Sequence, residues 1–271
     1  MSNLHAIQQS RLARFGVSQC VDVHCHVLPG IDDGPKNLDE SLTLCRALMR
    51  DGITTAIATP HQLGRYDGHN SAAQVRQRVA ELQGILDEKK IPLKILSGGE
   101  VRIDERIGKF LDEDHILTLA DGNRFLLLEL PSSVAIDPAV LMPRLKDANV
   151  MVILAHAERY DSLQTDPDSA QAWLDAGAVL QVNAGAPVGA FGQSAARAAW
   201  HWLSRGWVSL IATDAHSVGT RRPRMTDAID AIAEKLGEDV ARCVCIENPI
   251  RVAEGRELQR GDQPQMNTDK G

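Results

Sequence analysis

The sequence predicts an α/β protein built as a single parallel barrel, and three observations support this fold class. Seven short β-rich runs recur along the 271 residues, amphipathic segments separate most of them, and no linker or low-complexity stretch divides the chain. An open doubly wound sheet is the alternative, but no glycine-rich fingerprint follows the first run, as a dinucleotide-binding fold would require. We therefore expect one barrel domain over residues 21–260.

The predicted strands are short runs rich in Val, Ile and Leu. In chain order they are CVDVHC, ITTAIATP, PLKILSG, FLLLEL, VMVILAH, AVLQVNA and VSLIATDAH. Side chains alternate along a strand, so Asp22, His24 and His26 are expected to point into the barrel. The odd-numbered residues of 21–25 are then expected to face the helices, which explains Cys25 as a packing residue rather than a metal ligand.

The segments between the runs carry helix start and stop signals. Asn37 can cap a helix that reaches Met49, Glu40 completes a capping box three residues on, and apolar side chains form one stripe. Gly52 ends this helix. Two later segments, SAQAWLDAG and SAARAAWHWLSRG, repeat the pattern and also end on glycine.

The two ends of the chain are expected to lie outside the barrel. Residues 1–20 are interpreted as a helical N-terminal extension, and the polar residues 261–271 as a disordered tail. The extension lacks the apolar centre of a secretory signal, and no run approaches the roughly 20 apolar residues of a membrane helix. We expect no membrane insertion, and the extension could serve a homo-oligomer interface.

The composition is that of an ordinary globular protein, with 44% hydrophobic and 24% charged residues. The net charge of −7 and the absence of a Lys/Arg-rich block argue against a nucleic-acid partner. The five cysteines are odd in number and form no C-x-x-C pair, so we interpret them as small buried apolar residues in a reducing compartment. A cytoplasmic protein is the expectation.

Ionisable residues gather at the carboxyl ends of the predicted strands, which meet at one rim of a β/α barrel. Six of the seven runs have a metal-binding residue type at the end or within two residues of it, and only the sixth has a neutral one there, Asn183. A lone His or Glu at a strand end is usually structural, whereas their joint occurrence predicts a metal site. With one aspartate from the loop after the first run, the candidate ligands are His24, His26, Asp33, His61, Glu100, Glu129, His156, Asp214 and His216.

The number and type of these residues predict several ions. Carboxylates that share one pocket repel one another and need cations to stay ionised. A catalytic Zn²⁺ takes about three protein ligands, so the set suits about three ions. Three divalent ions carry about +6 against about −4 from the carboxylates, and this surplus would attract a phosphate dianion. Imidazole and carboxylate ligands without thiolate favour Mn²⁺, Fe²⁺ or Zn²⁺.

Two arginines follow candidate ligands closely in the sequence. Arg159 comes three residues after His156, and Arg221 comes five residues after His216. A guanidinium group matches phosphate oxygens with two parallel hydrogen bonds, so both are candidates for holding a phosphoryl group. Arg222 is the alternative to Arg221.

These motifs together resemble a known family. DVHCHVLPGIDDGP, TTAIATPH, GGE, LLLELP, AHAERY and ATDAHS are similar to the motifs of PHP-domain metallophosphatases. More narrowly, they resemble the manganese-dependent tyrosine-protein phosphatases of bacterial capsule and exopolysaccharide gene clusters. The resemblance covers residues 21–252, and LPGIDDGP with HAERY is much more specific than H-x-H alone. The chain has TRRPR where the family commonly has GRPP, and it has a longer N-terminus.

The resemblance implies a distorted (β/α)₇ barrel of the PHP type with a trinuclear Mn²⁺ site. It implies metal-ligand roles for the nine candidates above and phosphate-handling roles for Arg159 and Arg221. The implied reaction is hydrolysis of phosphotyrosine in a protein by a metal-activated water. Because Glu129 ends a central strand, we expect it to be the carboxylate that bridges two ions. The implied partner is a bacterial tyrosine kinase that controls polysaccharide polymerisation and export.

Other functions stay open from the sequence. They are hydrolysis of histidinol phosphate or another small phosphomonoester, a metal-dependent nuclease or proofreading module, and a non-catalytic metal-binding scaffold. Cys245 and Arg251 also match the C-x₅-R spacing of cysteine-dependent phosphatases. We interpret this match as chance, because Glu247 would repel phosphate and Pro249 lacks an N–H donor in that loop.

Overall fold

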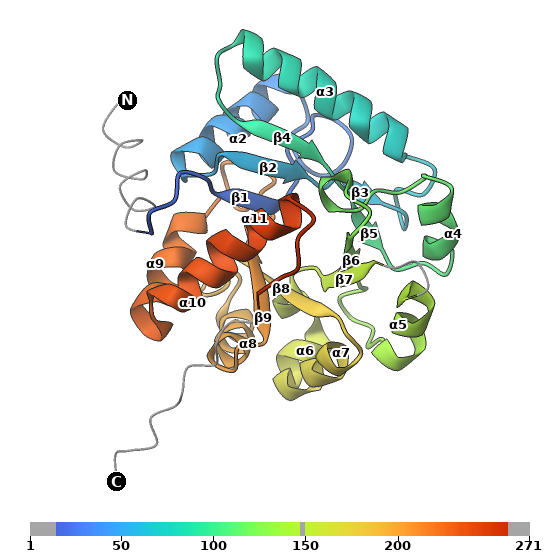
Figure 1. Cartoon of the computed structure of the whole chain (residues 1–271), viewed down its shortest axis with the longest axis vertical. Coiled ribbons are helices and arrows are strands. Elements are labelled where there is room, and N and C mark those ends of the chain that lie inside the picture. Colours follow the sequence, from blue (N-terminus) through green and yellow to red (C-terminus); the bar gives the residue numbers. More distant parts are fainter. Residues whose placement is uncertain (1–14, 147–149, 260–271) are drawn as a thin grey trace.

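The structure, a computed structural model, describes residues 15–146 and 150–259. It confirms an α/β protein with parallel sheets (Figure 1). The helix predicted for the N-terminal extension falls mainly on residues 1–14, and the predicted tail on residues 261–271, both outside the described residues. The strands are β1 (Val21–Cys25), β2 (Thr55–Ala58), β3 (His61–Gln62), β4 (Lys94–Ser97), β5 (Glu100–Arg102), β6 (Phe125–Glu129), β7 (Met151–Leu154), β8 (Val179–Asn183) and β9 (Val208–Ala212).

The helices follow the predicted alternation with strands. They are α2 (Leu38–Arg50), α3 (Ala72–Glu88), α4 (Ile107–Asp112), α5 (Pro138–Lys146), α6 (Asp161–Thr165), α7 (Gln171–Asp175), α8 (Gln193–Ser204), α9 (Met225–Leu236), α10 (Glu238–Arg242) and α11 (Asn248–Ala253). Short 3₁₀ turns span Leu119–Asp121, Ala157–Arg159 and Pro167–Ala170, and a π-helical turn spans Cys243–Glu247. In the described part of the chain, no helix has the length and apolar character needed to cross a membrane.

All pairs of neighbouring strands are parallel, in two sheets ordered β1-β2-β4 and β3-β5-β6-β7-β8-β9. The sheets are linked along the chain, because β3 follows β2 and β5 follows β4 after a short interruption. Where these interruptions meet, the backbone N–H of Glu100 donates to the carbonyl of Pro60 at 3.1 Å, a normal hydrogen-bond distance. At the other edge, Cys25 of β1 forms a parallel bridge with Ala215, just beyond β9.

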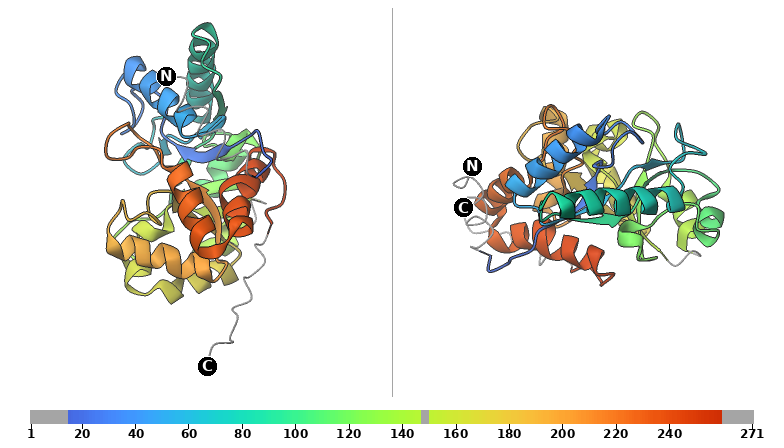
Figure 2. Two further views of the ribbon diagram at one scale, coloured as in Figure 1. Left: turned by 90° about the vertical axis from the view of Figure 1, so that its left-hand side faces the viewer. Right: turned by 90° about the horizontal axis from the view of Figure 1, so that it is seen from above.

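Most of the core lies between the strands and the surrounding helices. Side chains such as Leu44 and Leu48 of α2 and Leu82 and Leu86 of α3 are buried in one continuous apolar cluster with the outward residues of the strands. Figure 2 shows the helices around the strands, with the long helix α3 packed along β4. Burial of this apolar layer removes the helix faces from water and supplies the main driving force for the fold.

A second apolar cluster consists mainly of strand side chains on the inward face. Val21 and Val23 of β1 pack there with Phe125 and Leu127 of β6, and Val252 of α11 covers this end of the strands. In Figure 1, helix α11 accordingly lies in front of the centre of the fold, beside β1. The amino ends of the strands therefore form an apolar floor.

This inner cluster corrects the predicted alternation of the first strand. We expected Val21 and Val23 to face the helices and Asp22 to face inward, but the two valines lie in the inner cluster. The pairing register of β1 with β2 shifts between Asp22 and Cys25, as in a β-bulge. Because the bulge changes the phase of the alternation, Cys25 packs on the helix side as predicted.

The predicted helix signals largely match the structure. The side chain of Asn37 accepts a hydrogen bond from the backbone N–H of Glu40 (3.0 Å) at the start of α2. Gly52 has a φ of +89°, the left-handed conformation expected after a helix end. The segment Ser169–Gly177 is less regular than predicted, because it begins as a 3₁₀ turn after Pro167 and continues as the short helix α7.

Candidate metal centre

The carboxyl ends of the strands bring the predicted ligand residues to one place. The first two histidines lie at and just after the end of β1. His61 and Glu100 are the first residues of β3 and β5, shortly after the ends of β2 and β4, and the other residues lie at or just after the ends of β6, β7 and β9 or in the loop after β1. The parallel arrangement explains this gathering, since every strand points its last residues to the same rim. The residues that the structure brings together are His24, His26, Asp33, His61, Glu100, Glu129, His156, Asp214 and His216.

Glu100 lies at the centre of the cluster and is fully buried. Its Oε1 lies 2.7 Å from Nε2 of His156. Its Oε2 lies 3.0 Å from Nδ1 of His61, 3.2 Å from Nε2 of His26 and 3.4 Å from Nε2 of His24. One carboxylate therefore faces four imidazoles that come from three other strand ends.

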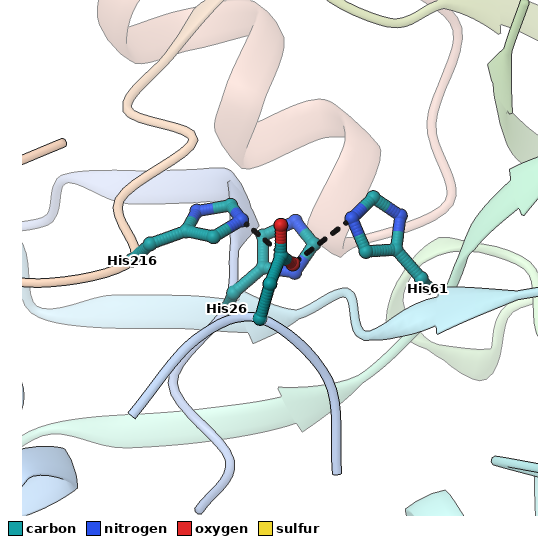
Figure 3. Close-up of side chains that lie close together, drawn as sticks. His26, His61 and His216 are labelled. Atoms are coloured by element: carbon teal, nitrogen blue, oxygen red, sulfur yellow. Dashed lines mark ion pairs between the residues drawn. The ribbon is translucent and has the colours of Figure 1, made fainter. Parts of the chain in front are cut away.

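Asp33 organises a second part of the cluster nearer the surface. Its Oδ1 lies 3.1 Å from Nε2 of His61 and 3.2 Å from Nε2 of His216. The rings of His26, His61 and His216 converge on this point, and the dashed lines in Figure 3 mark the two ion pairs with Asp33. The Asp33 side chain is 38% exposed, so this part of the site is open to solvent.

The arrangement of donor atoms fits divalent cations. Three overlapping groups have one potential ligand atom per residue within 4.8 Å of one another: His26, Asp33, His61 and His216; His24, His26 and Glu100; and His61, Glu100 and Glu129. Buried polar atoms normally have a hydrogen-bond partner. Oε2 of Glu100, Nδ1 of His156 and Nε2 of His216 are buried and make no well-aligned hydrogen bond, so each has a lone pair available for a cation.

The charges in the cluster are strongly coupled. Burial alone would raise the pKa values of Glu100 and Asp214, but neighbouring cationic side chains outweigh it and hold both pKa values below their usual range. Burial alone would lower the pKa values of His24 and His61, but nearby carboxylates raise them to about 9 and about 11. Burial and a neighbouring imidazole lower the pKa of His216 to about 4. Cations that bind here would replace protons on the imidazoles, which makes metal affinity pH-dependent.

Two of the candidate ligands have left-handed backbone conformations that non-glycine residues rarely adopt. The φ angle is +32° at His156 and +50° at Asp214. Such conformations cost of order 1–3 kcal/mol each and are found where function requires a fixed side-chain direction. In this chain they turn the residues after β7 and β9 into the cluster.

Sequence reasoning missed three polar residues that orient the candidate ligands. Oε1 of Gln181 lies 3.1 Å from Nδ1 of His24, and Nδ2 of Asn183 donates to Asp214 (2.9 Å). Asp32, in the loop after β1, accepts from Nδ1 of His26 at 2.7 Å. A signal for Gln181 and Asn183 was present in the sequence, because these two polar residues lie two positions apart in the otherwise apolar strand β8 and so point to the same face.

A cavity of about 430 Å³ opens onto the cluster and is rich in arginine. Arg159 and Arg221, the two predicted phosphate-handling residues, line it and both bind Asp214, at 3.2 Å and 2.7 Å respectively. Arg65 and Arg102 also line it and were not predicted. The neighbouring Arg222, the alternative to Arg221, is exposed and does not line the cavity. The wall facing the carboxylate cluster is therefore cationic and suited to an anion.

The C-x₅-R match lies away from this cavity. Cys245 is fully buried in the π-helical turn before α11, and burial raises the pKa of its thiol well above the ordinary value. Arg251 donates a hydrogen bond to the carbonyl of Glu257. A thiol that is buried and protonated is a poor nucleophile, so the interpretation of this spacing as chance agrees with the structure.

Comparison with known proteins gives one consistent result. The sequence model of the family "Capsular polysaccharide synthesis, CpsB/CapC" matches residues 20–254. Tyrosine-protein phosphatase YwqE of Bacillus subtilis (strain 168) is 31% identical over 222 residues, which cover 81% of this chain and 86% of that protein. The putative tyrosine-protein phosphatase CapC of Staphylococcus aureus is 31% identical over 207 residues, covering 76% and 80%.

A solved structure is similar over almost the whole fold. It comes from a study of YwqE from Bacillus subtilis and CpsB from Streptococcus pneumoniae, described there as unique metal-dependent tyrosine phosphatases. The TM-score is 0.84 at 29% sequence identity, and the match covers 90% of this chain and 98% of the other. The described core of the present chain therefore has the same architecture as those proteins.

Proposed function

Because this chain belongs to the capsular polysaccharide synthesis CpsB/CapC family, we propose that it is a metal-dependent phosphatase that hydrolyses phosphotyrosine in proteins. The observation that carries the proposal is the convergence of imidazole and carboxylate groups beside an arginine-lined cavity. This arrangement combines cation ligands with donors for phosphoryl oxygens, the two requirements of metal-assisted phosphomonoester hydrolysis.

The proposed ligand set contains all nine residues predicted from the sequence, and Mn²⁺ is the proposed ion. Divalent ions held there supply Lewis-acid stabilisation of the phosphoryl oxygens and a nucleophilic water at neutral pH. The sequence favours Glu129 as a ligand shared between ions. Glu100 would also be able to hold more than one cation, because it contacts four imidazoles and belongs to two of the three candidate groups. Glu129 lies toward the cavity, with Oε1 at 3.3 Å from Arg102.

Arg159 and Arg221 are the proposed phosphate-binding residues. Both line the cavity, and Asp214 holds both guanidinium groups in place, which reduces the entropy lost when they bind substrate. Their donors would hold non-bridging phosphoryl oxygens and offset the charge that develops as the ester bond breaks. Asp214 thereby connects the cation site with the phosphate site.

Four finer proposals concern the substrate protein, the closure of the barrel, the cellular compartment and the oligomeric state. A bacterial tyrosine kinase is the proposed substrate protein, on the basis of the resemblance alone. A closed, distorted (β/α)₇ barrel is supported by the bridge from Cys25 to Ala215, which joins β1 to the segment after β9. A reducing cytoplasmic compartment is supported by the five cysteines, which are all buried thiols. A homo-oligomer stays a prediction.

The test pairs a peptide assay with metal removal. Purified protein is assayed on a phosphotyrosine peptide and on histidinol phosphate, before and after treatment with a chelator and after readdition of Mn²⁺. We expect turnover of the peptide, its loss on chelation and its recovery with Mn²⁺. Preference for histidinol phosphate would favour the small-molecule alternative, and chelator-resistant turnover would contradict the metal mechanism.

A further inference from the structure

The cavity beside the candidate metal centre has a nearly continuous charged lining with one apolar feature. Its acidic, imidazole and guanidinium groups are Asp33, His61, Arg65, Arg102, Glu129, Arg159 and Arg221. The uncharged side chains in the lining are Leu63 and Tyr66, and Leu63 is only 6% exposed. A ligand that carries an aromatic ring next to its phosphate needs apolar surface for that ring, and Tyr66 is the side chain that offers it.

The ring of Tyr66 is held in a defined orientation. It stacks nearly parallel to the imidazole of His61, with an interplanar angle of 10° and 5.4 Å between ring centres. The guanidinium carbon of Arg65 lies 4.9 Å from the centre of the Tyr66 ring, a cation–π distance. Since His61 is a candidate metal ligand, the phenol ring lies directly beside the proposed reaction site.

The loop that carries Tyr66 is fixed at both ends. Nδ2 of Asn70 donates to the carbonyl of His61 (3.0 Å) and to that of Ile31 (2.9 Å), which ties this loop to the one that carries Asp33. A Cβ on Gly64, whose φ is +57°, would lie 2.9 Å from Cγ of Arg102. Glycine at this position therefore lets the loop lie against the stem of Arg102.

We propose that Tyr66 is a specificity-determining residue that contacts the aromatic ring of the phosphorylated tyrosine. This inference rests on the proposed function and assigns a side chain to its substrate class. The ring of the substrate would lie against Tyr66 at the mouth while its phosphate reaches the arginines and the metal centre. An alkyl phosphate such as phosphoserine cannot make this contact, so Tyr66 would favour aryl over alkyl phosphates.

The experiment separates ring binding from phosphate binding. Binding of phenylphosphonate and of methylphosphonate to the Mn²⁺-reconstituted protein is measured by calorimetry for the wild type and for Tyr66→Ala, Tyr66→Phe and His69→Ala. His69 is the matched control, because it is exposed in the same loop and does not line the cavity. Bound metal is measured in every variant, which detects a disturbed His61.

We expect Tyr66→Ala to weaken phenylphosphonate binding roughly 2- to 10-fold, the range that an aromatic pair contributes, with methylphosphonate unaffected. Tyr66→Phe and His69→Ala should keep the wild-type preference for the aryl ligand. An equal loss for both ligands, or no loss for either, would overturn the inference. Turnover of a phosphotyrosine peptide by the wild type tests the proposed function separately, so the two failures are distinguishable.

Discussion

Asp32 provides a sharp prediction, because His26 is the candidate ligand whose ring its carboxylate orients; its other contact with a candidate ligand is with the backbone N–H of His61, at 3.3 Å. Its buried Oδ2 accepts from Nδ1 of His26 at 2.7 Å, which leaves Nε2 of that ring facing Glu100 and Asp214. Its Oδ1 accepts from the backbone N–H of Gly34 at 2.9 Å and so shapes the turn that carries Asp33. Asp32→Asn keeps an oxygen for the turn but can present an N–H group to His26.

The substitution should force His26 into the wrong tautomer. A proton on Nε2 would occupy the lone pair that a cation needs, or the charge-assisted hydrogen bond to Nδ1 would be lost. A hydrogen bond to a charged group contributes about 1.5–3 kcal/mol, which corresponds to roughly 10- to 100-fold in metal affinity. This range agrees with the usual cost of removing a carboxylate that orients a metal-binding histidine.

The assay is the initial rate of phosphotyrosine-peptide hydrolysis as a function of free Mn²⁺. We expect the half-saturating Mn²⁺ concentration of Asp32→Asn to rise roughly 10- to 100-fold, with much of the rate restored at saturation. Asp39→Asn, on the exposed first turn of α2, is the matched control and should behave as wild type. An unchanged Mn²⁺ dependence in Asp32→Asn would refute the orienting role.

Three further predictions concern phosphate binding, pH and loop packing. Arg159→Ala should lower kcat/KM about 10²- to 10³-fold with metal content unchanged, and a parallel loss of bound metal would argue against a phosphate-binding role. Burial raises the pKa of Asp51 to about 6 despite hydrogen bonds from Thr226. The folded state therefore binds the Asp51 proton more tightly than the unfolded state, which adds about 3 kcal/mol to the free energy of unfolding near pH 4, and this contribution is lost as the pH rises through 6. Urea unfolding of chelator-treated protein should show a shallower pH dependence in Asp51→Asn, and equal slopes would disprove this. Gly34→Ala should destabilise the fold by about 1–3 kcal/mol and raise the Mn²⁺ requirement, because the new Cβ would lie 2.6 Å from the carbonyl oxygen of His26; an unchanged melting temperature would contradict it.

The gathering of polar residues at one rim was predictable because it follows from chain direction alone. Parallel strands that each end in a metal-binding residue type must present those residues together, whatever the details of helix packing. His61, Glu100 and His156 meet for this reason, although they are far apart in the sequence. Helix starts such as Asn37 were also predictable, because a cap depends on a few neighbouring residues.

The remaining features depend on long-range geometry that a single sequence does not encode visibly. The bulge in β1 reverses the expected directions of Val21 and Val23, and no residue in VDVHC marks it as glycine or proline would. The position of Tyr66 beside His61 depends on a loop that Asn70 holds against His61 and the distant Ile31, a contact that no local pattern predicts. Local signals therefore identify ligand types, while the walls of the cavity require the folded chain.

The most direct test of the central claim is the metal content of the purified protein, measured together with its activity. Bound metal is quantified by elemental analysis before chelation, after chelation and after reconstitution, and phosphotyrosine-peptide turnover is measured on the same samples. We predict about three divalent ions per chain, loss of turnover as they are removed, and recovery as Mn²⁺ returns. Full activity in a protein shown to contain no metal would contradict the account.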